Sequence, residues 1–386
     1  MTLVFSSFFN IFAPVDILNN LPLSYFRIND KQTHLNCMKA IDALHEAHKL
    51  AFSPFVFETA YCLLELKILE VMHENRAPMS IKAIASKAEV SEYGVRVLLE
   101  MAASAEIVEQ AEEDVYKATK IGYFILRDEM TRVNIYFTHD VCYRGLFHLK
   151  ESIINGKAEG LKTLGDWDTI YQGLSILPEP IKTSWFDFDH FYSDNSFDDA
   201  LKVIFKYDPA LIYDIGGNTG KWCIAATKHN PDVRMKMFDL PVQIKVAKEN
   251  IGQIEESKDR VDFQEIDLLD TTSEIPAGAD VYWMSQFLDC FSEAEIEQIL
   301  LKIKKNMKAD ARIFIMETFI DNQRFPAATH SLVATSLYFT ALANGNSKMY
   351  TSSAMKYIVD KAGFECIDEH HLHGDSFHTI LEIKLK

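Results

Sequence analysis

The chain has 386 residues, of which 48% are hydrophobic and 25% charged, a composition that is ordinary for a globular protein and argues against disorder. Its formal net charge of -17 repels phosphate backbones and disfavours a nucleic-acid partner. The six cysteines are scattered without a C-x-x-C pair, which argues against a disulfide framework or a thiolate zinc site and predicts a reducing, cytoplasmic compartment.

Residues 1–37 are expected to be an N-terminal arm. No basic residue precedes Arg27, and polar residues and Pro14 interrupt the apolar stretch, which argues against a secretory signal and a membrane span. A small extra helix, or an arm that packs on a partner chain, fits this pattern. A misassigned gene start, with true initiation at Met38, is the alternative.

Residues 38–118 are expected to form a winged-helix domain. Apolar residues recur at three- and four-residue spacing along its helical segments, and serines stand where helix caps are expected. The predicted elements follow the order of a winged helix: helices over 38–75 with an apolar face along 51–72, a helix over 81–88 capped by Ser80, a helix capped by Ser91, and a hairpin of 107–109 with 115–117.

Two functions compete for this winged helix, namely DNA binding and a structural role as a dimerisation domain or substrate lid. A helix that enters the major groove should be basic. The segment from Ser91 to Ser104 carries Arg96 but also Glu92 and Glu100. The structural role is therefore favoured.

Residues 119–205 are expected to be a helical linker and substrate-pocket region. This segment is rich in aromatic residues that either line an aromatic pocket or, for most of them, belong to the core. These residues are Tyr136, Phe137, Tyr143, Phe147, Trp167, Tyr171, Trp185, Phe186, Phe188, Phe191 and Tyr192.

Residues 206–386 are expected to form an α/β domain with a Rossmann-like, doubly wound parallel sheet, because strands and helices alternate. The predicted strands are 211–215, 233–238, 261–266, 281–284, 312–318 and 379–384. The helices expected between them include 221–229, 243–251, 293–307 and 352–362.

The motif that carries the chemistry begins at Asp214, at the end of the first of these strands, and continues through a glycine turn to Gly220. Glycines let the backbone approach a ligand without a Cβ clash. Asp239 ends the next strand, where a carboxylate can accept hydrogen bonds from both hydroxyls of a ribose. Because ligands of such sheets bind outside the carboxyl ends of the strands, Asp214, Gly216, Asp239 and Asp267 should converge there.

The turn reads D-x-G-G-x-x-G rather than the G-x-G-x-x-G of dinucleotide-binding proteins, and no P-loop motif occurs in the chain. A carboxylate beside the glycines would repel a pyrophosphate and would suit a cationic ligand. S-adenosylmethionine brings a sulfonium, an ammonium and a ribose for Asp239, so the motif predicts this cofactor.

These pieces make the chain resemble, over roughly residues 50–386, the plant-type small-molecule O-methyltransferases that include caffeate and acetylserotonin methyltransferases and bacterial relatives. The resemblance implies a class I methyltransferase fold, S-adenosylmethionine as cofactor, and a homodimer formed through the winged-helix domain. The matching pieces are the run from Asp214 to Gly220, F-D-L-P at 238–241, Asp267-Leu268, S-E-A-E at 292–295, M-E-T at 316–318 and A-G-F at 362–364.

Site roles follow from the resemblance, position by position. Asp214, Gly216 and the neighbouring Gly217, Asn218 and Gly220 would hold the methionine part of the cofactor. Asp239 would bind the ribose with Leu240 packed nearby, and Asp267 and Leu268 would lie at the adenine. Where the family often has a lysine near the adenine, this chain has Ser285 or its neighbour Gln286.

The family's general-base histidine is replaced here. Aligned back from Ser292, Asp289 stands in its place, and such an acid needs a raised pKa to act as a base. The alternative is that Asp289 caps or orients the following helix. Glu317 matches a family acid that orients the base, or else is a strand-end acid bonded to backbone N–H groups. His139 and His330 are the best other candidates for acid–base chemistry, and no metal site is expected.

The function expected from this combination is methyl transfer to a hydroxyl, preferably a phenolic one, of a small molecule. Methylation at nitrogen or carbon, or chemistry that uses the same cofactor without methylation, is the alternative within the fold. The alternative from another class is a winged-helix regulator with a degenerate sensor domain.

Overall fold

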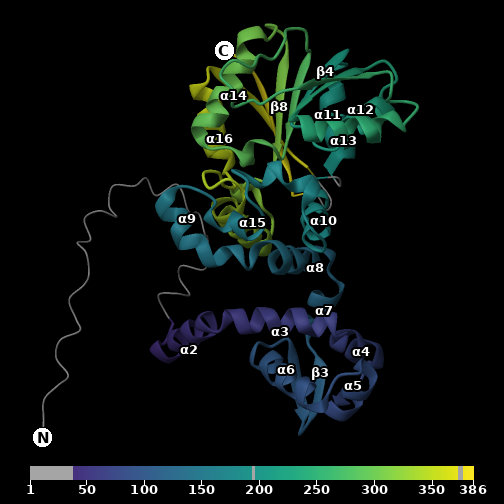
Figure 1. Cartoon of the computed structure of the whole chain (residues 1–386), viewed down its shortest axis with the longest axis vertical. Helices are drawn as coiled ribbons and strands as arrows, with labels where there is room; N and C mark the ends of the chain where they lie inside the picture. Colours follow the sequence, from purple (N-terminus) through teal and green to yellow (C-terminus); the bar gives the residue numbers. More distant parts are fainter. Residues whose placement is uncertain (1–37, 194–195, 373–376) are drawn as a thin grey trace, which may run out of the picture.

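The structure is a computed structural model that describes residues 38–193, 196–372 and 377–386, so the N-terminal arm expected over residues 1–37 lies outside the described residues. The chain forms three layers: an N-terminal domain, a middle layer of helices, and an α/β domain (Figure 1). No helix within the described ranges has the length and apolar composition that a membrane crossing requires. The five cysteines of these ranges all carry free thiols.

The N-terminal domain contains the helices and the hairpin expected from the sequence, together with one short additional strand. Its sheet has the order β1-β3-β2, with antiparallel neighbours. Its elements are α2 (Ala40–Ala51), α3 (Ser53–Glu65), α4 (Ile68–Asn75), β1 (Met79–Ser80), α5 (Ile81–Ala88), α6 (Glu92–Ser104), β2 (Val108–Glu112) and β3 (Val115–Ala118).

The helices predicted over 38–75 are confirmed as α2, α3 and α4, and the apolar stretch noted along 51–72 extends over α3 and into α4. Lys67 takes a left-handed conformation with φ of 55°, and this residue separates α3 from α4. The apolar faces of both helices still enter one core, so periodicity alone did not reveal the break.

The two predicted serine caps are confirmed. The Ser80 hydroxyl accepts from the N–H of Ala83 at 3.3 Å, and the Ser91 hydroxyl accepts from the N–H of Gly94 at 3.0 Å. On α6, Arg96 donates to Asp114 at 2.9 Å, so the basic residue of this segment is paired within its own domain.

The middle layer is helical, as expected, but irregular. Its core also receives residues from the α/β domain, namely α15 (Pro326–Tyr338) and the π-helix η11 (Phe339–Ala343). The elements of residues 119–193 are α7 (Lys120–Arg127), α8 (Glu129–Tyr136), η2 (Phe137–Cys142), η3 (Gly145–His148), α9 (Leu149–Asn155), η4 (Glu159–Thr163), η5 (Ile170–Gln172), η6 (Leu174–Ile176) and α10 (Ile181–Ser193). Helix α11 (Phe197–Ile204) packs instead into a core of the α/β domain, beside α12 (Lys221–His229) (Figure 1).

The α/β domain is built on a seven-stranded sheet of order β6-β5-β4-β7-β8-β10-β9. Its first helices follow the strands in the expected rhythm. Its elements are η8 (Phe205–Tyr207), β4 (Leu211–Ile215), α12 (Lys221–His229), β5 (Arg234–Asp239), α13 (Pro241–Gly252), β6 (Val261–Glu265), β7 (Val281–Ser285), η9 (Leu288–Cys290), α14 (Glu293–Asn306), β8 (Arg312–Glu317), η10 (Ile320–Asn322), α16 (Ser352–Lys361), β9 (Phe364–His371) and β10 (Thr379–Leu385).

The expected doubly wound sheet is confirmed, and it is mixed because β10 runs antiparallel to both β8 and β9. The five strands from β6 to β8 are parallel neighbours in the order given above. Buried apolar residues cover both faces of the sheet. The parallel strands therefore place their carboxyl ends along one edge, toward the middle layer (Figure 1).

Candidate functional site

The glycine turn after β4 has a backbone that requires glycine. Gly216 has φ of 77°, and a Cβ at this position would lie 2.1 Å from the Phe287 ring. The N–H of Gly216 donates to the carbonyl of Phe238 at 2.8 Å, which holds the turn against the end of β5.

Asp239, the last residue of β5, is bonded to this turn. Its carboxylate accepts from the N–H of Asn218 at 2.8 Å and from the N–H of Leu240 at 2.7 Å. Burial raises the pKa of Asp239 to about 6, although both backbone hydrogen bonds act in the opposite direction.

Of the other residues of the motif, some line a cavity and others only pack against neighbouring helices. Asp214 is buried, and its carboxylate accepts from the Cys223 thiol at 3.1 Å. Burial raises the pKa of Asp214 to about 7. Asp214, Gly217 and Ser285 line a small cavity of about 70 Å³ beside the turn. A Cβ on Gly220 would lie 2.6 Å from Ile251, so this glycine serves the contact between α12 and α13.

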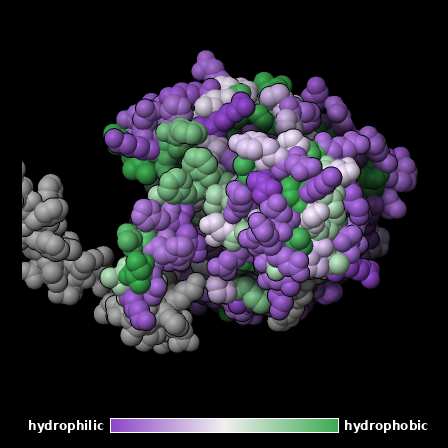
Figure 2. Space-filling model, turned by 90° about the horizontal axis from the view of Figure 1, so that it is seen from below, coloured by the Kyte–Doolittle hydropathy of each residue, from purple (hydrophilic) through white to green (hydrophobic). Residues whose placement is uncertain are grey.

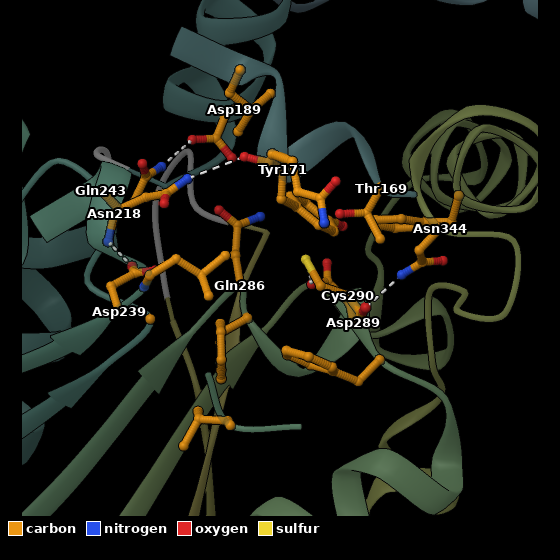
Figure 3. A pocket seen from close by; sticks show the side chains of 18 of the residues that line it. Thr169, Tyr171, Asp189, Asn218, Asp239, Gln243, Gln286, Asp289, Cys290 and Asn344 are labelled. Atoms are coloured by element: carbon orange, nitrogen blue, oxygen red, sulfur yellow. Dashed lines mark hydrogen bonds between the residues drawn. The ribbon is translucent and has the colours of Figure 1, made fainter. Parts of the chain in front are cut away.

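A larger cavity of about 590 Å³ opens between the carboxyl edge of the sheet and the middle layer. The sequence-predicted residues Gly216, Asn218, Asp239, Leu240, Asp267 and Leu268 line one end of it. We call this part the nucleoside end. Figure 3 shows Asp239 and Asn218 on one side of the cavity, and Asp289, Cys290 and Asn344 on the other.

The opposite part, which we call the acceptor end, is largely aromatic. Of the aromatic residues noted in the sequence, Tyr171, Trp185 and Phe188 line it. Trp185 donates its indole N–H to the Tyr338 hydroxyl at 2.8 Å. Phe137 stacks on Phe188 with 3.9 Å between ring centroids and belongs to the core behind the cavity, as expected for most of these aromatics.

Four residues that line the cavity carry a buried polar atom for which the described residues offer no hydrogen-bond partner. These atoms are the hydroxyl oxygens of Tyr171 and Thr318 and the side-chain oxygens of Gln243 and Gln286. Such groups are costly to bury unless a ligand or water pairs with them. The unpaired atoms therefore mark this cavity as a ligand site.

Asp289 and Glu317 lie together next to the cavity. Asp289 is in η9 and lines the acceptor end, where it is only 7% exposed and burial raises its pKa to about 6. Glu317 ends β8 and accepts from the N–H groups of Phe287 at 3.2 Å and Leu288 at 3.0 Å. Burial and the nearby charge of Asp289 raise the pKa of Glu317 well above its usual value.

This geometry bears on the alternatives for both acids. Ser292, not Asp289, caps α14, and it forms a capping box with Glu295. Asp289 is therefore free of the helix-capping role. Glu317 has the backbone hydrogen bonds of a strand-end acid, and through them it holds the segment that carries Asp289.

His139 lies apart from this cavity. Its ring stacks on Tyr61 of α3 with 3.5 Å between centroids, and its Nδ1 lies 2.8 Å from Asp140. Neither His139 nor His330 is among the residues that line the cavity. The structure thus brings Asp289 and Glu317 together but does not bring His139 to them.

Several lining residues were not assigned from the sequence. Tyr171 and Gln243 come from elements without a binding motif, while Gln286 was noted only as a neighbour of Ser285. Gln286 directly follows β7 and has a left-handed φ of 44°. A polar residue immediately after a buried strand is the one signal that pointed toward Gln286.

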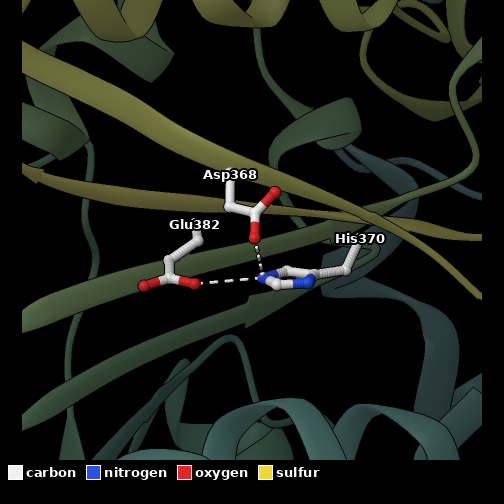
Figure 4. Close-up of side chains that lie close together, drawn as sticks. All are labelled: Asp368, His370 and Glu382. Carbon is white, nitrogen blue, oxygen red and sulfur yellow. Dashed lines mark hydrogen bonds and ion pairs between the residues drawn. The ribbon is translucent and has the colours of Figure 1, made fainter.

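Asp368, His370 and Glu382 form a cluster with metal-ligand chemistry on β9 and β10 (Figure 4). Glu382 pairs with Arg312 at 2.7 Å and with His370 at 3.0 Å, while Asp368 lies 3.7 Å from the same His370 nitrogen. The buried Glu382 is thus already neutralised by side chains of the chain itself, and a metal ion would compete with Arg312.

Two family models match the chain, an O-methyltransferase domain over residues 197–365 and a Dimerisation2-like domain over residues 45–116. Human acetylserotonin O-methyltransferase is 22% identical over 291 residues, which cover 70% of this chain and 78% of that protein. Norreticuline-7-O-methyltransferase of Papaver somniferum is 22% identical over 326 residues, which cover 78% of this chain and 86% of that protein.

Solved structures share the fold over most of the chain. The mitomycin 7-O-methyltransferase MmcR has a TM-score of 0.66 at 20% identity, covering 90% of this chain and 98% of that chain. Human N-acetylserotonin methyltransferase in complex with SAM has a TM-score of 0.60 at 18% identity, covering 90% of this chain and 100% of that chain. At these identities the likeness concerns the fold.

Proposed function

This chain belongs to the S-adenosylmethionine-dependent O-methyltransferases that act on small molecules, and we propose that its acceptor is a phenolic hydroxyl of an aromatic compound. The main observation behind this proposal is that Asp239 is hydrogen-bonded to the glycine turn, and that both lie at one end of a cavity lined by aromatic residues. The cavity is large enough for two small ligands side by side, one at each end.

The nucleoside end fits the cofactor. Asp239 retains free lone pairs for ribose hydroxyls after accepting two backbone hydrogen bonds. Gly216, which has no Cβ, lets the turn pack closely against the Phe287 ring at the cavity, and the side-chain oxygens of Gln243 and Gln286 offer acceptors to the ligand. We assign the adenine to the part lined by Asp267 and Leu268, and the methionine part to the glycine turn with Asp214 and Ser285 nearby.

S-adenosylmethionine supplies a methyl group that its sulfonium already activates. The protein's task is then to align the acceptor oxygen and to remove its proton. Tyr171, Trp185 and Phe188 hold an aromatic ring by stacking and edge contacts. Trp185 is buried and Tyr171 and Phe188 are half-buried, so the three side chains also limit the access of water to the reacting oxygen.

We assign the role of proton acceptor to Asp289. Its carboxylate lines the acceptor end, and burial raises its pKa toward the range in which an acid can act as a base near neutral pH. Glu317 is a positioning residue that holds the segment of Asp289 through the N–H groups of Phe287 and Leu288. We leave His139 out of this constellation because it lies against Tyr61.

We also propose that two copies of the chain associate through the N-terminal domain, which we regard as a winged helix. Helices α2 and α3 expose large apolar side chains, among them Ile41, Leu50 and Phe55, which are 66%, 75% and 63% exposed. Seen from below, the surface shows hydrophobic residues gathered in patches among hydrophilic ones (Figure 2). Free thiols agree with the cytoplasm as the compartment.

The test of the proposed function is direct. Purified protein is titrated calorimetrically with S-adenosylhomocysteine and then incubated with S-adenosylmethionine carrying a labelled methyl and with a panel of phenols. We expect saturable binding, and a product heavier by one methyl in mass spectrometry. Absence of binding together with absence of a methylated product would reject the proposal.

A further inference from the structure

The charges that line the large cavity all have one sign. Five acidic residues line it, namely Asp189, Asp239, Asp267, Asp289 and Glu295. Among the described residues, no lysine, arginine or histidine lines it. His190 and Lys221 line the adjoining small cavity beside the glycine turn, so the excess of carboxylates concerns the acceptor end of the large cavity.

Three of these acids belong to the acceptor end or to the boundary between the two ends. Asp289 accepts from the Cys290 thiol at 3.5 Å, and no cation of the part of the chain that the structure describes forms an ion pair with it. Glu295 accepts from Ser292 in the capping box and from Asn346 at 3.2 Å, so all its partners are neutral. Asp189 accepts from the side chain of Asn218 at 3.2 Å and also lines the small cavity with His190 and Lys221, so the negative charge of the acceptor end is that of Asp289 and Glu295.

Lys348, which directly precedes the lining residue Met349 in the chain, is engaged outside the cavity. Lys348 lies 3.7 Å from Glu293, on the exposed side of the first turn of α14, and over the ring of Tyr350. Neither Lys348 nor Glu293 lines the cavity. Lys348 therefore does not neutralise the carboxylates of the acceptor end.

From this arrangement we infer that the cavity selects its acceptor by charge: it takes aromatic compounds bearing a protonated amine, or no charge, and rejects those bearing a carboxylate. The inference rests on the proposed function, because it names the class of acceptor for the same site. A buried carboxylate is stabilised by an opposite charge and destabilised by a like charge. An ammonium on the acceptor supplies the cation that the chain itself lacks there.

The size of the effect follows from Coulomb's law. Two unit charges about 6 Å apart, at an effective dielectric constant of about 20, change a binding constant by roughly a hundredfold. Screening by water at the cavity mouth reduces this value. We therefore expect an amine to bind about tenfold or more tightly than a carboxylate of the same size.

The experiment measures binding rather than turnover. Matched probe sets carry an ethylamine, an ethanol or an acetate group on the same ring, with phenol, catechol, indole and naphthol rings. Each probe is titrated by ligand-observed NMR at pH 8 into full-length protein saturated with S-adenosylhomocysteine, which cannot react. We expect amines to bind best, alcohols next and acetates weakest in every set that binds.

Two variants test which carboxylates of the cavity cause the preference for amines. Asp289→Asn and Glu295→Gln each remove one charge, and glutamine at 295 can still complete the capping box. We expect both to reduce the preference for amine over acetate. Glu293→Gln is the matched control, because Glu293 lies in the same helix turn but outside the cavity, and it should leave the preference unchanged.

The outcomes separate the two proposals. Equal binding of acetates and amines, or no binding by any set, overturns the charge selection. The charge selection is also overturned if Glu293→Gln abolishes the preference for amines as strongly as Asp289→Asn does. The preference would then arise from charges on the protein surface rather than from the cavity. Failure of methyl transfer to every phenol, with the binding order intact, would overturn the proposed reaction and leave the charge selection standing.

Discussion

The main-chain N–H of Asn218 donates to Oδ2 of Asp239 over 2.8 Å, so the turn after β4 and the last residue of β5 form a single unit. A carboxylate that must also bind a ribose is thereby fixed in place before the ligand arrives. Preorganisation of this kind lowers the cost of binding.

Replacing Asp239 with alanine should cost most of the affinity for the cofactor. The change removes the acceptor of two backbone N–H groups and of the ribose hydroxyls, and we expect S-adenosylhomocysteine to bind about a hundredfold more weakly. Calorimetric titration measures the loss. Glu265→Gln is the control, because Glu265 ends the adjacent strand β6 but does not line the cavity. Equal losses in both variants would contradict the role of Asp239.

Replacing Gly216 with alanine should damage both folding and cofactor binding. The new Cβ would meet the Phe287 ring, and an L-residue at φ of 77° is strained. We expect a loss of about 1–3 kcal/mol in the free energy of unfolding, measured by urea denaturation. Gly252→Ala, at the end of α13, has open space around its Cβ and should be neutral or slightly stabilising. A neutral Gly216→Ala would show that the turn can rearrange.

The role of Glu317 can be separated into hydrogen bonding and charge. Glu317→Gln keeps an oxygen for the N–H groups of Phe287 and Leu288, so we expect stability to change by less than about 1 kcal/mol. Glu317→Ala leaves both buried donors unpaired and should cost about 2–4 kcal/mol. If Glu317→Gln retained stability but lost the pH dependence described next, Glu317 would take part in proton transfer rather than only in positioning.

The rate of methyl transfer should rise with pH and level off above about pH 6. Asp289 must be ionised to accept a proton, and burial raises its pKa to about 6, so the active fraction grows as pH increases through that value. We expect Asp289→Asn to lower kcat by about a hundredfold and to remove this titration. Single-turnover rates between pH 5 and pH 8 test it. A variant that keeps both the rate and the profile would exclude Asp289 as the base.

Asp289 also makes the stability of the fold depend on pH, but stability should fall with rising pH whereas the rate of methyl transfer should rise. The folded-state pKa of Asp289 lies above the value of about 3.9 expected in the unfolded chain, so the folded state binds more protons between about pH 4 and pH 6. The contribution of Asp289 to stability therefore falls as pH rises through this window. Asparagine does not titrate. As the pH rises through this window, the melting temperature of Asp289→Asn should therefore increase relative to that of the parent protein.

Replacing His139 with phenylalanine should leave methyl transfer unchanged to within about twofold. The phenyl ring can keep the stacking on Tyr61, while the hydrogen bond with Asp140 is lost, so we expect about 1 kcal/mol of destabilisation. Thermal unfolding and initial rates give the two values. A tenfold fall in kcat without loss of stability would instead make His139 a catalytic residue.

The sequence was most informative where structure depends on neighbours along the chain. The bounds of β4 and α12 are those expected, because a buried strand, a glycine turn and an amphipathic helix each leave a local pattern. The nucleoside end follows from the same patterns, since the ends of parallel strands meet at one edge.

The missed features depend on contacts between distant segments. Strand β9 carries Glu365, Asp368 and Glu369 and lies at the edge of the sheet, so it shows no apolar run. The acceptor end combines Tyr171 of a short η5 helix with residues of α15, and neither the spacing nor the composition of these segments joins them. The unpaired hydroxyl of Tyr171 becomes visible only in three dimensions.

The position of β10 has a consequence for synthesis of the protein. The ribosome synthesises β10 after β8 and β9, yet β10 lies between these two strands in the sheet. Until it arrives, β8 presents an unpaired edge that neighbouring nascent chains can join. A chain that stops before Thr379 would therefore be prone to aggregate, which makes the synthesis of β10 the step that closes this part of the sheet.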